Sequence, residues 1–189
     1  MMDNQNHAVL LKERMLQDYQ SQMGNLTKNN TQYIRQLKDQ AIGLFKEKGF
    51  PSPKAEDWRF TDLSSILSHD FQFNFENKSK PFDISTIFSC EVYDLDTFSV
   101  ALLNGWYVYK HAPLAKMPDG TIIGSLAKAM EVYPELVDKY FGKSANMESN
   151  QLLALNTAFS QDGIFIYVPD NVKVDKAIQA ISLVDEQYP

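Results

Sequence analysis

The stretch 152–168 constrains the fold more than any other part of the sequence, because its hydrophobic period changes along its length. Apolar residues first recur at the spacing of a helix, and a β-branched and aromatic run follows. Asp162 and Gly163 lie at the change and form a turn signal, since aspartate bonds nearby backbone and glycine accepts a positive φ. The stretch predicts a helix followed by a strand at Ile164–Val168. Its apolar content predicts a strand that is buried on both faces or nearly so.

Short strands are expected to continue beyond this point. Val172 and Val174 flank a polar residue, and a second apolar run lies at 178–184. The turns between these runs are too short for a crossover helix. We interpret the sequence as stopping early in a longer series of strands. Its open edge at 172–185 is expected to pair with a second copy of the chain or to fray.

Composition limits the class of protein. The chain has 189 residues, of which 44% are hydrophobic and 22% are charged, as in an ordinary globular protein with one good core, or with a small domain and part of another. No apolar run reaches the roughly 20 residues of a membrane helix, and no basic and apolar leader is recognisable. We therefore expect a cytoplasmic protein without a membrane segment. The net charge of −6 and the absence of clustered cations argue against binding to nucleic acid.

The first fifty residues predict a helical hairpin. An apolar stripe at helical spacing begins at Ala8 and is expected to end before Gly24. A second stripe follows the candidate N-caps at 29–31 and should stop at Gly49, because Pro51 prevents its continuation. A hairpin of this size cannot bury both stripes by itself. It should pack on another element or on a partner chain.

Strand signals follow the hairpin. Phe71, Phe73 and Phe75 alternate with polar residues, which predicts a strand. The Asn104-Gly105 pair between apolar runs predicts a β-hairpin over Ser99–Tyr109, because a type I′ turn needs a positive φ at both positions.

A strand and two short helices are expected next. A strand is predicted at Thr121–Ile123, and Ser125 should cap the helix that follows it. Pro134 should open a second helix at its first position, and this helix should end at Phe141, before Gly142.

The segment 56–61 is the strongest candidate for a contact surface. Two aromatic residues flank an arginine and two acidic residues precede them, so a turn could place a carboxylate against the guanidinium beside a ring. Two interpretations remain open. The segment could be a docking surface or an anion site, or it could be an aromatic plug with a local ion pair that fixes the entry into a short helix capped by Thr61 or Asp62. The residues of this segment are Glu56, Asp57, Trp58, Arg59, Phe60 and Thr61.

Residues that could carry catalysis or bind a metal are few. His7, His69 and His111 are far apart and have no second ligand at metal spacing. Cys90 is the single cysteine, which excludes an internal disulfide, and nothing local supports a thiolate and base pair. The sequence contains neither a phosphate-binding loop nor a Gly-x-Ser-x-Gly elbow. Carboxylates at turns are expected to cap backbone groups, as at Asp162 and Asp170. We assign no catalytic, cofactor or metal residue and interpret the chain as an interaction or scaffold module.

Two segments carry a family resemblance. The first reads Glu-Asp-Trp-Arg-Phe-Thr at 56–61, and the second, at 154–169, contains Ala-Leu-Asn-Thr-Ala-Phe and then Asp-Gly-Ile-Phe-Ile-Tyr-Val-Pro. Both resemble the SufB/SufD family, the scaffold proteins of the Suf iron–sulfur cluster assembly system. The Asn-Gly hairpin, the Pro-Asp-Gly turn at 118–120 and the proline-led helix lie between them in the family's order. The first segment, after a helical hairpin, is more similar to the SufD branch than to the SufB branch.

This resemblance implies an α+β fold. An N-terminal helical domain with a β-hairpin, at 1–150, would lead into the first rungs of a right-handed parallel β-helix, at 151–189, which this sequence truncates. The resemblance also implies a non-catalytic subunit of a SufB-SufC-SufD complex, with SufB-like and SufC-like partners. It transfers no cluster ligand to a residue here.

Two parts of the chain are expected to face partners, the segment 56–61 and the helical hairpin Ala8–Lys48. Two other functions remain open for a chain of this pattern. One is a small β-helical enzyme that acts on carbohydrate, although the predicted strands lack the paired carboxylates that such a cleft needs. The other is a generic α+β binding domain with an apolar pocket.

Overall fold

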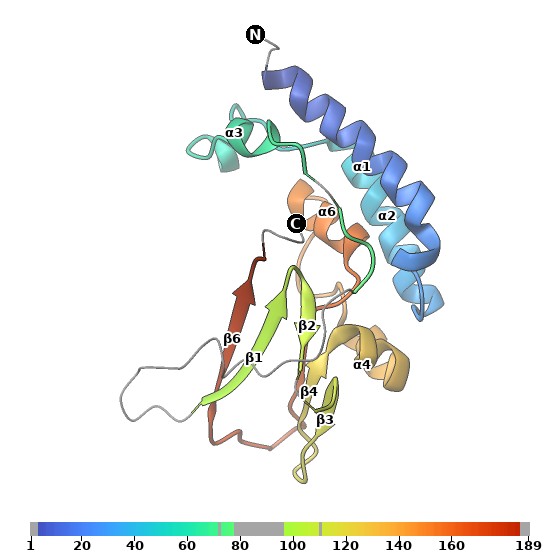
Figure 1. Ribbon diagram of the computed structural model, residues 1–189, viewed down its shortest axis with the longest axis vertical. Coiled ribbons are helices and arrows are strands. Elements are labelled where there is room, and N and C mark those ends of the chain that lie inside the picture. Colours follow the sequence, from blue (N-terminus) through green and yellow to red (C-terminus); the bar gives the residue numbers. More distant parts are fainter. Residues whose placement is uncertain (1–3, 72, 78–96, 110, 186–189) are drawn as a thin grey trace. The chain divides into compact units, whose positions relative to one another are not determined.

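The computed structural model describes residues 4–71, 73–77, 97–109 and 111–185, and the chain divides into two compact units (Figure 1). The helical unit comprises Met1–Phe75 and Glu135–Ser160. The sheet unit comprises Glu76–Pro134 and Gln161–Pro189. Each unit therefore combines two segments that are far apart in the sequence. The predicted Cys90 thiol lies outside the described residues.

The helical unit contains two long helices and several short ones. The long helices form the expected hairpin, and within the described residues no helix is long and apolar enough to cross a membrane. Its elements are α1 (Asn4–Leu26), α2 (Gln32–Lys48), the 3-10 turn η1 (Glu56–Trp58), α3 (Ser64–Leu67), α5 (Pro134–Tyr140) and α6 (Gln151–Phe159).

Local sequence explains where these helices begin and end. Thr31 is the N-cap of α2 and its hydroxyl accepts the Ile34 N–H, while Gly49 ends the helix with a φ of 67°. The prediction that α1 ends before Gly24 is wrong by three residues. The chain leaves the helix only after Leu26, because Gly24 tolerates helical backbone and the left-handed conformation, with a φ of 61°, comes later, at Asn29.

The hairpin packs on α6, as the need to bury both stripes predicts. Tyr19 of α1 and Ala41 of α2 form one buried cluster with Ala158 of α6. The ring of Phe159 meets the ring of Tyr19 edge-on at 5.8 Å between centroids. A segment about 110 residues downstream in the sequence therefore completes the core that the hairpin cannot form alone.

The described part of the sheet unit contains two three-stranded sheets and one short helix. In one sheet the order is β2-β1-β6, and in the other it is β3-β4-β5. The elements are β1 (Thr97–Leu103), β2 (Trp106–Val108), β3 (Leu114–Lys116), β4 (Ile122–Ser125), α4 (Leu126–Val132), β5 (Ile164–Tyr167) and β6 (Ala177–Leu183).

The core of the sheet unit lies between its two sheets. Val100 and Tyr107 of the first sheet and Ile123 of the second form a buried cluster, with half-buried side chains of both sheets packed around it. Burial raises the pKa of Tyr107, and the nearby Asp162 carboxylate raises it further. The predicted Asn-Gly hairpin is confirmed. Leu103 pairs with Trp106 across a two-residue loop in which Asn104 and Gly105 have φ values of 48° and 85°.

The predicted strand and helices between residues 121 and 142 are also confirmed. The strand β4 forms, the Ser125 hydroxyl accepts the Lys128 N–H as the N-cap of α4, and α5 begins at Pro134. Gly142 follows α5 with a φ of 73°.

The prediction of a strand through Phe71, Phe73 and Phe75 is wrong for the described residues of that segment. These residues are irregular in conformation. The rings of Phe73 and Phe75 instead lie 6.5 and 6.2 Å from the ring of Phe159. The alternating phenylalanines therefore pack against α6 and do not form a strand. Contacts with the helical unit decide the conformation of so short a run.

The helix followed by a strand at 152–168 is confirmed, but the strand is not buried on both faces. Ile164 to Tyr167 are half-buried or exposed, and Ile166 is 41% exposed. β5 pairs with β4 and with no other strand among the described residues, so it is an edge strand. An apolar run alone cannot distinguish a central strand from an edge strand.

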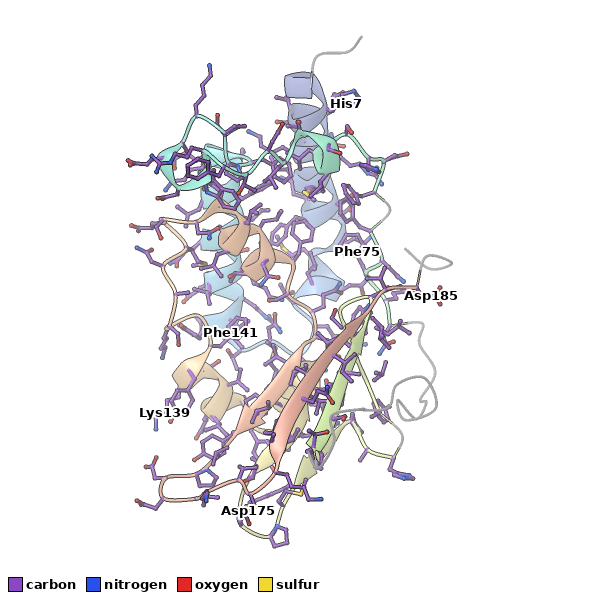
Figure 2. The ribbon with its side chains drawn as sticks, turned by 90° about the vertical axis from the view of Figure 1, so that its left-hand side faces the viewer. His7, Phe75, Lys139, Phe141, Asp175 and Asp185 are labelled. Carbon is purple, nitrogen blue, oxygen red and sulfur yellow. The ribbon has the colours of Figure 1, made fainter. Side chains whose placement is uncertain are left out.

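The short strand expected at Val172 and Val174 is not formed, whereas the run at 178–184 forms β6. β6 pairs with β1 in parallel, with Thr97 opposite Ala177 and Leu103 opposite Leu183. Asp175 and Asp185 mark the two ends of β6 (Figure 2). The Asn104 side chain extends the pairing, since its amide donates to the Asp185 carbonyl and its oxygen accepts the Asp185 N–H.

The observed fold is α+β. The continuation of the sheet unit into a right-handed parallel β-helix stays a prediction, and so does the division into 1–150 and 151–189.

Candidate partner-contact site

The segment between α2 and α3 is attached to the helical hairpin at its beginning. Pro51 is buried, and the ring of Phe50 meets the ring of Phe45 edge-on at 5.1 Å. Lys12 of α1 donates to the Lys46 carbonyl near the end of α2, and the stem of Lys12 lies 3.4 Å from the Cβ position of Gly49. The chain therefore enters the segment from a fixed point on the hairpin.

The same segment is attached to α1 at its other end. The Arg14 guanidinium donates to an Asp70 carboxylate oxygen at 2.7 Å and lies 5.4 Å from the centre of the Phe73 ring. Figure 2 shows Phe75, two residues farther along, beside α1. Because both ends are held, the intervening residues form a loop of defined shape on the helical unit.

Backbone hydrogen bonds close the loop into two consecutive turns. The Trp58 N–H donates to the Ala55 carbonyl at 3.0 Å, and the Thr61 N–H donates to the Trp58 carbonyl at 2.8 Å. Trp58 is half-buried. These bonds present the side chains of 59 and 60 outward from the turn.

Arg59 and Phe60 form the outer tip of the loop. The guanidinium lies 4.7 Å from the centre of the Phe60 ring and 4.0 Å from a Glu56 carboxylate oxygen. Phe60 is 89% exposed. The local ion pair that the sequence predicts is confirmed, but the interpretation of an aromatic plug is wrong for Phe60, because its ring covers no core.

Asp62 rather than Thr61 supports the start of α3. Its Oδ1 accepts the Ser64 N–H at 2.9 Å. The backbone and side chain of Ser64 lower the pKa of the Asp62 carboxyl, so it is ionised at neutral pH.

Two hollows lie beside this loop on the helical unit and adjoin at Leu67, which lines both. The first, of about 420 Å³, is formed by the start of α1, the proline-rich turn at 50–53 and α3, and we call it the α1–α3 hollow. The second, of about 350 Å³, is lined by both leucine and polar side chains, among them His7 and His69. The His69 Nδ1 contacts the Ser65 carbonyl at 2.8 Å, so this nitrogen carries the proton.

The helical unit holds a buried cation that fixes the hairpin on which the loop is mounted. Lys38 is 0% exposed, and its ammonium donates to the carbonyls of Leu26, at 2.5 Å, and Ser160. Burial lowers the pKa of Lys38 to about 8. In the same unit the Tyr19 hydroxyl donates to Asp39 at 3.1 Å, and burial followed by the Asp39 charge raises the pKa of Tyr19.

Asp162 of the sheet unit, like Lys38 of the helical unit, hydrogen-bonds to segments that are distant in the sequence. Its carboxylate accepts the Ser125 hydroxyl at 2.8 Å and the N–H groups of Ala127 and Tyr107, each at 3.0 Å. The sequence predicts a capping carboxylate here, and that prediction is confirmed. The helix that it caps, however, begins about 36 residues earlier in the sequence, and spacing alone does not indicate such a partner.

Among the residues that the structure describes, no group of three histidine, cysteine, aspartate or glutamate side chains could hold a metal ion. Sequence reasoning found the loop at 56–61 and missed Lys38. The signal for Lys38 was nevertheless present, because it follows Ile34 and Leu37 at helical spacing and so falls within the apolar stripe of α2.

Comparison with models of protein families identifies the family of the chain. The family model described as the SufBD protein N-terminal region matches residues 10–180. The chain belongs to the SufB/SufD family. Its match covers most of the helical hairpin, the loop at 56–61 and both sheets except the end of β6.

Curated relatives agree with this assignment. The chain is 41% identical over 61 residues to an iron–sulfur cluster assembly SufBD family protein of Arabidopsis thaliana, 40% identical over 55 residues to one of Synechocystis, and 36% identical over 63 residues to the iron–sulfur cluster assembly protein SufD of Bacillus subtilis. These matches cover 32%, 29% and 33% of this chain. They span only 13%, 12% and 14% of the three relatives.

Proposed function

We propose that the chain works as a SufD-like, non-catalytic scaffold subunit in iron–sulfur cluster assembly. The observation that carries this proposal is the family match over residues 10–180. A Bacillus subtilis relative is named SufD, an assembly protein, which supports the choice of branch. The carbohydrate-acting enzyme is not retained, because nothing in the family's description favours it.

The partners that we propose are SufB-like and SufC-like proteins, and the proposed contact is the loop at 56–61. An aromatic residue beside an arginine is a common composition for an interface anchor. Phe60 is exposed at the tip of a loop held at both ends, so little conformational entropy would be lost when a partner binds. The helical hairpin would act as the rigid support of this loop.

A second proposed contact is the edge of β6. This strand pairs only with β1 among the described residues, and its other edge could accept a strand. A further rung of a parallel β-helix or a second copy of the chain would satisfy that edge.

The test is co-purification of the chain with SufB and SufC of the same organism, followed by size-exclusion chromatography. Co-elution with either protein is expected, and Phe60→Ala should reduce it. A chain that co-elutes with neither protein would contradict the proposal.

A further inference from the structure

We propose that the α1–α3 hollow is a docking site for an amphipathic helix of a partner protein, one with apolar side chains on one face and lysine or arginine beside them. This inference rests on the proposed function, since it names the chemistry of a partner of the same scaffold. The occupant would bind next to the 56–61 loop rather than only to its tip.

The floor of the hollow is apolar and open to solvent. Val9 lies on one side, Pro51 and Pro53 on another, and Leu63 and Leu67 of the α3 region close it. Its volume of about 420 Å³ suits a few aliphatic side chains. A groove of this kind between helices and turns is typical of sites that receive the apolar face of a helix.

One exposed apolar residue lines the hollow, and two others adjoin its lining residues in the sequence. Val9 lines it and is 54% exposed, Leu10 lines the adjoining second hollow and is 56% exposed, and Ile66, which precedes the lining residue Leu67, is 55% exposed. Scattered exposed apolar residues are ordinary in proteins, but an exposed apolar residue inside a groove is a feature of interaction sites. The helical unit provides no element that covers them among its described residues.

The negative charge in the hollow favours a partner with a basic side chain. Among the described residues that line it, Asp62 alone has a charged side chain. One carboxylate oxygen accepts the Ser64 N–H, and the carboxylate can accept further hydrogen bonds. A purely apolar cover would remove water from this charge without compensation, which is unfavourable. A covering segment therefore has to bring a cation, and lysine or arginine beside an apolar face does so.

The surroundings of the hollow also exclude a strand as the occupant. The described residues that line it lie in helices, turns and irregular backbone, so no free strand edge is present there for a peptide to extend. Recognition must come from side chains, which favours a helix over an added strand.

The experiment uses the whole 189-residue chain and two synthetic helical peptides as probes. Each has about 15 residues, enough for a helix to form, with leucine at helical spacing on one face. One carries lysine beside the leucine face, and its twin carries glutamate. Binding of each fluorescently labelled peptide is measured by anisotropy. The lysine peptide should bind saturably and about tenfold more tightly than its twin.

Matched variants test where the peptide binds. Val9→Glu should weaken binding of the lysine peptide about tenfold, whereas Val132→Glu, a change at a similarly exposed helical valine of the sheet unit, should not. Asp62→Asn should remove most of the preference for lysine. Asp119→Asn should not, although Asp119 also accepts the N–H of the residue two positions on.

Several outcomes would overturn the inference: no saturable binding, equal binding of the two peptides, or equal effects of the two valine variants. If Val9→Glu melts early, Pro53→Glu replaces it, because Pro53 also lines the hollow and is exposed. A dimer of the free chain that Val9→Glu dissociates would assign the hollow to a second copy and also overturn the inference. The assays separate the two proposals. Co-elution with SufB or SufC without peptide binding contradicts this inference alone, and peptide binding without co-elution contradicts the proposed function alone.

Discussion

Lys38 of α2 donates a hydrogen bond to the backbone carbonyl of Ser160, 122 residues farther along the chain. The same ammonium donates to the carbonyl of Leu26, the last residue of α1. Ser160 directly follows α6, so one side chain satisfies carbonyls at the ends of two helices. A buried cation therefore joins the ends of α1 and α6 to α2, in addition to the apolar cluster that the three helices share.

Lys38→Met should lower the free energy of unfolding by about 2–4 kcal/mol. The methionine keeps most of the apolar stem but leaves two buried carbonyls without their donor. Urea denaturation measures the change. Lys46→Met, at an exposed position of the same helix, is the control and should stay within about 0.5 kcal/mol of wild type. A loss below that value for Lys38→Met would contradict the role given to Lys38.

The stability contributed by Lys38 should rise with pH in the alkaline range. Burial lowers the pKa of Lys38 in the folded chain from 10.5 to about 8. Between these values the unfolded chain holds the proton more tightly, so folding becomes more favourable as pH rises. The difference in unfolding free energy between wild type and Lys38→Met should grow by up to about 1.4 kcal/mol per pH unit. A difference that stays constant across this window would show that the ammonium is not desolvated.

Asp162→Ala should destabilise the sheet unit by about 2–4 kcal/mol, because three hydrogen bonds to its carboxylate are lost together. Asp162→Asn keeps an acceptor and should cost about half as much. Thermal melting of both variants measures the effect. Asp170→Ala, at an exposed turn, should leave the melting temperature nearly unchanged. Equal effects of the Asp162→Ala and Asp170→Ala substitutions would contradict the capping role of Asp162.

Gly124→Ala should destabilise the chain by more than about 2 kcal/mol. Gly124 has a φ of 157°, and a Cβ there would lie 2.3 Å from the Pro113 carbonyl oxygen. Gly43→Ala in α2 is the matched control. Nothing lies within 4 Å of its Cβ position, so it should stabilise the helix by about 0.5–1 kcal/mol. Chemical denaturation of the pair measures both changes, and a neutral Gly124→Ala would show that β3 and β4 can separate there.

The sequence predicted an element correctly where neighbouring residues decide its conformation. The Asn104-Gly105 turn, the Thr31 cap and the strand after Gly163 depend on neighbours in the sequence. The phenylalanine run at 71–75 failed because its conformation is decided by contact with Phe159, far along the chain. The parallel pairing of β1 with β6 was missed for the same reason.

The candidate site was likewise only partly predictable from the sequence. The composition of the 56–61 loop indicated an interaction surface, but only the structure shows that Phe60 is exposed while Trp58 is half-buried. The hollow beside the loop combines residues from α1, the proline-rich turn and α3. No spacing rule predicts such a combination, because it depends on how α3 folds back against α1.

The measurement that tests the central claim most directly is a calorimetric titration of the chain with the SufB protein of its own organism, for wild type and for Phe60→Ala. Phe60 is 89% exposed, so the variant should melt at the wild-type temperature. The account predicts that wild type binds and that Phe60→Ala binds about tenfold more weakly. Equal affinities, or no binding by wild type, would contradict a scaffold subunit that contacts its partner through this loop.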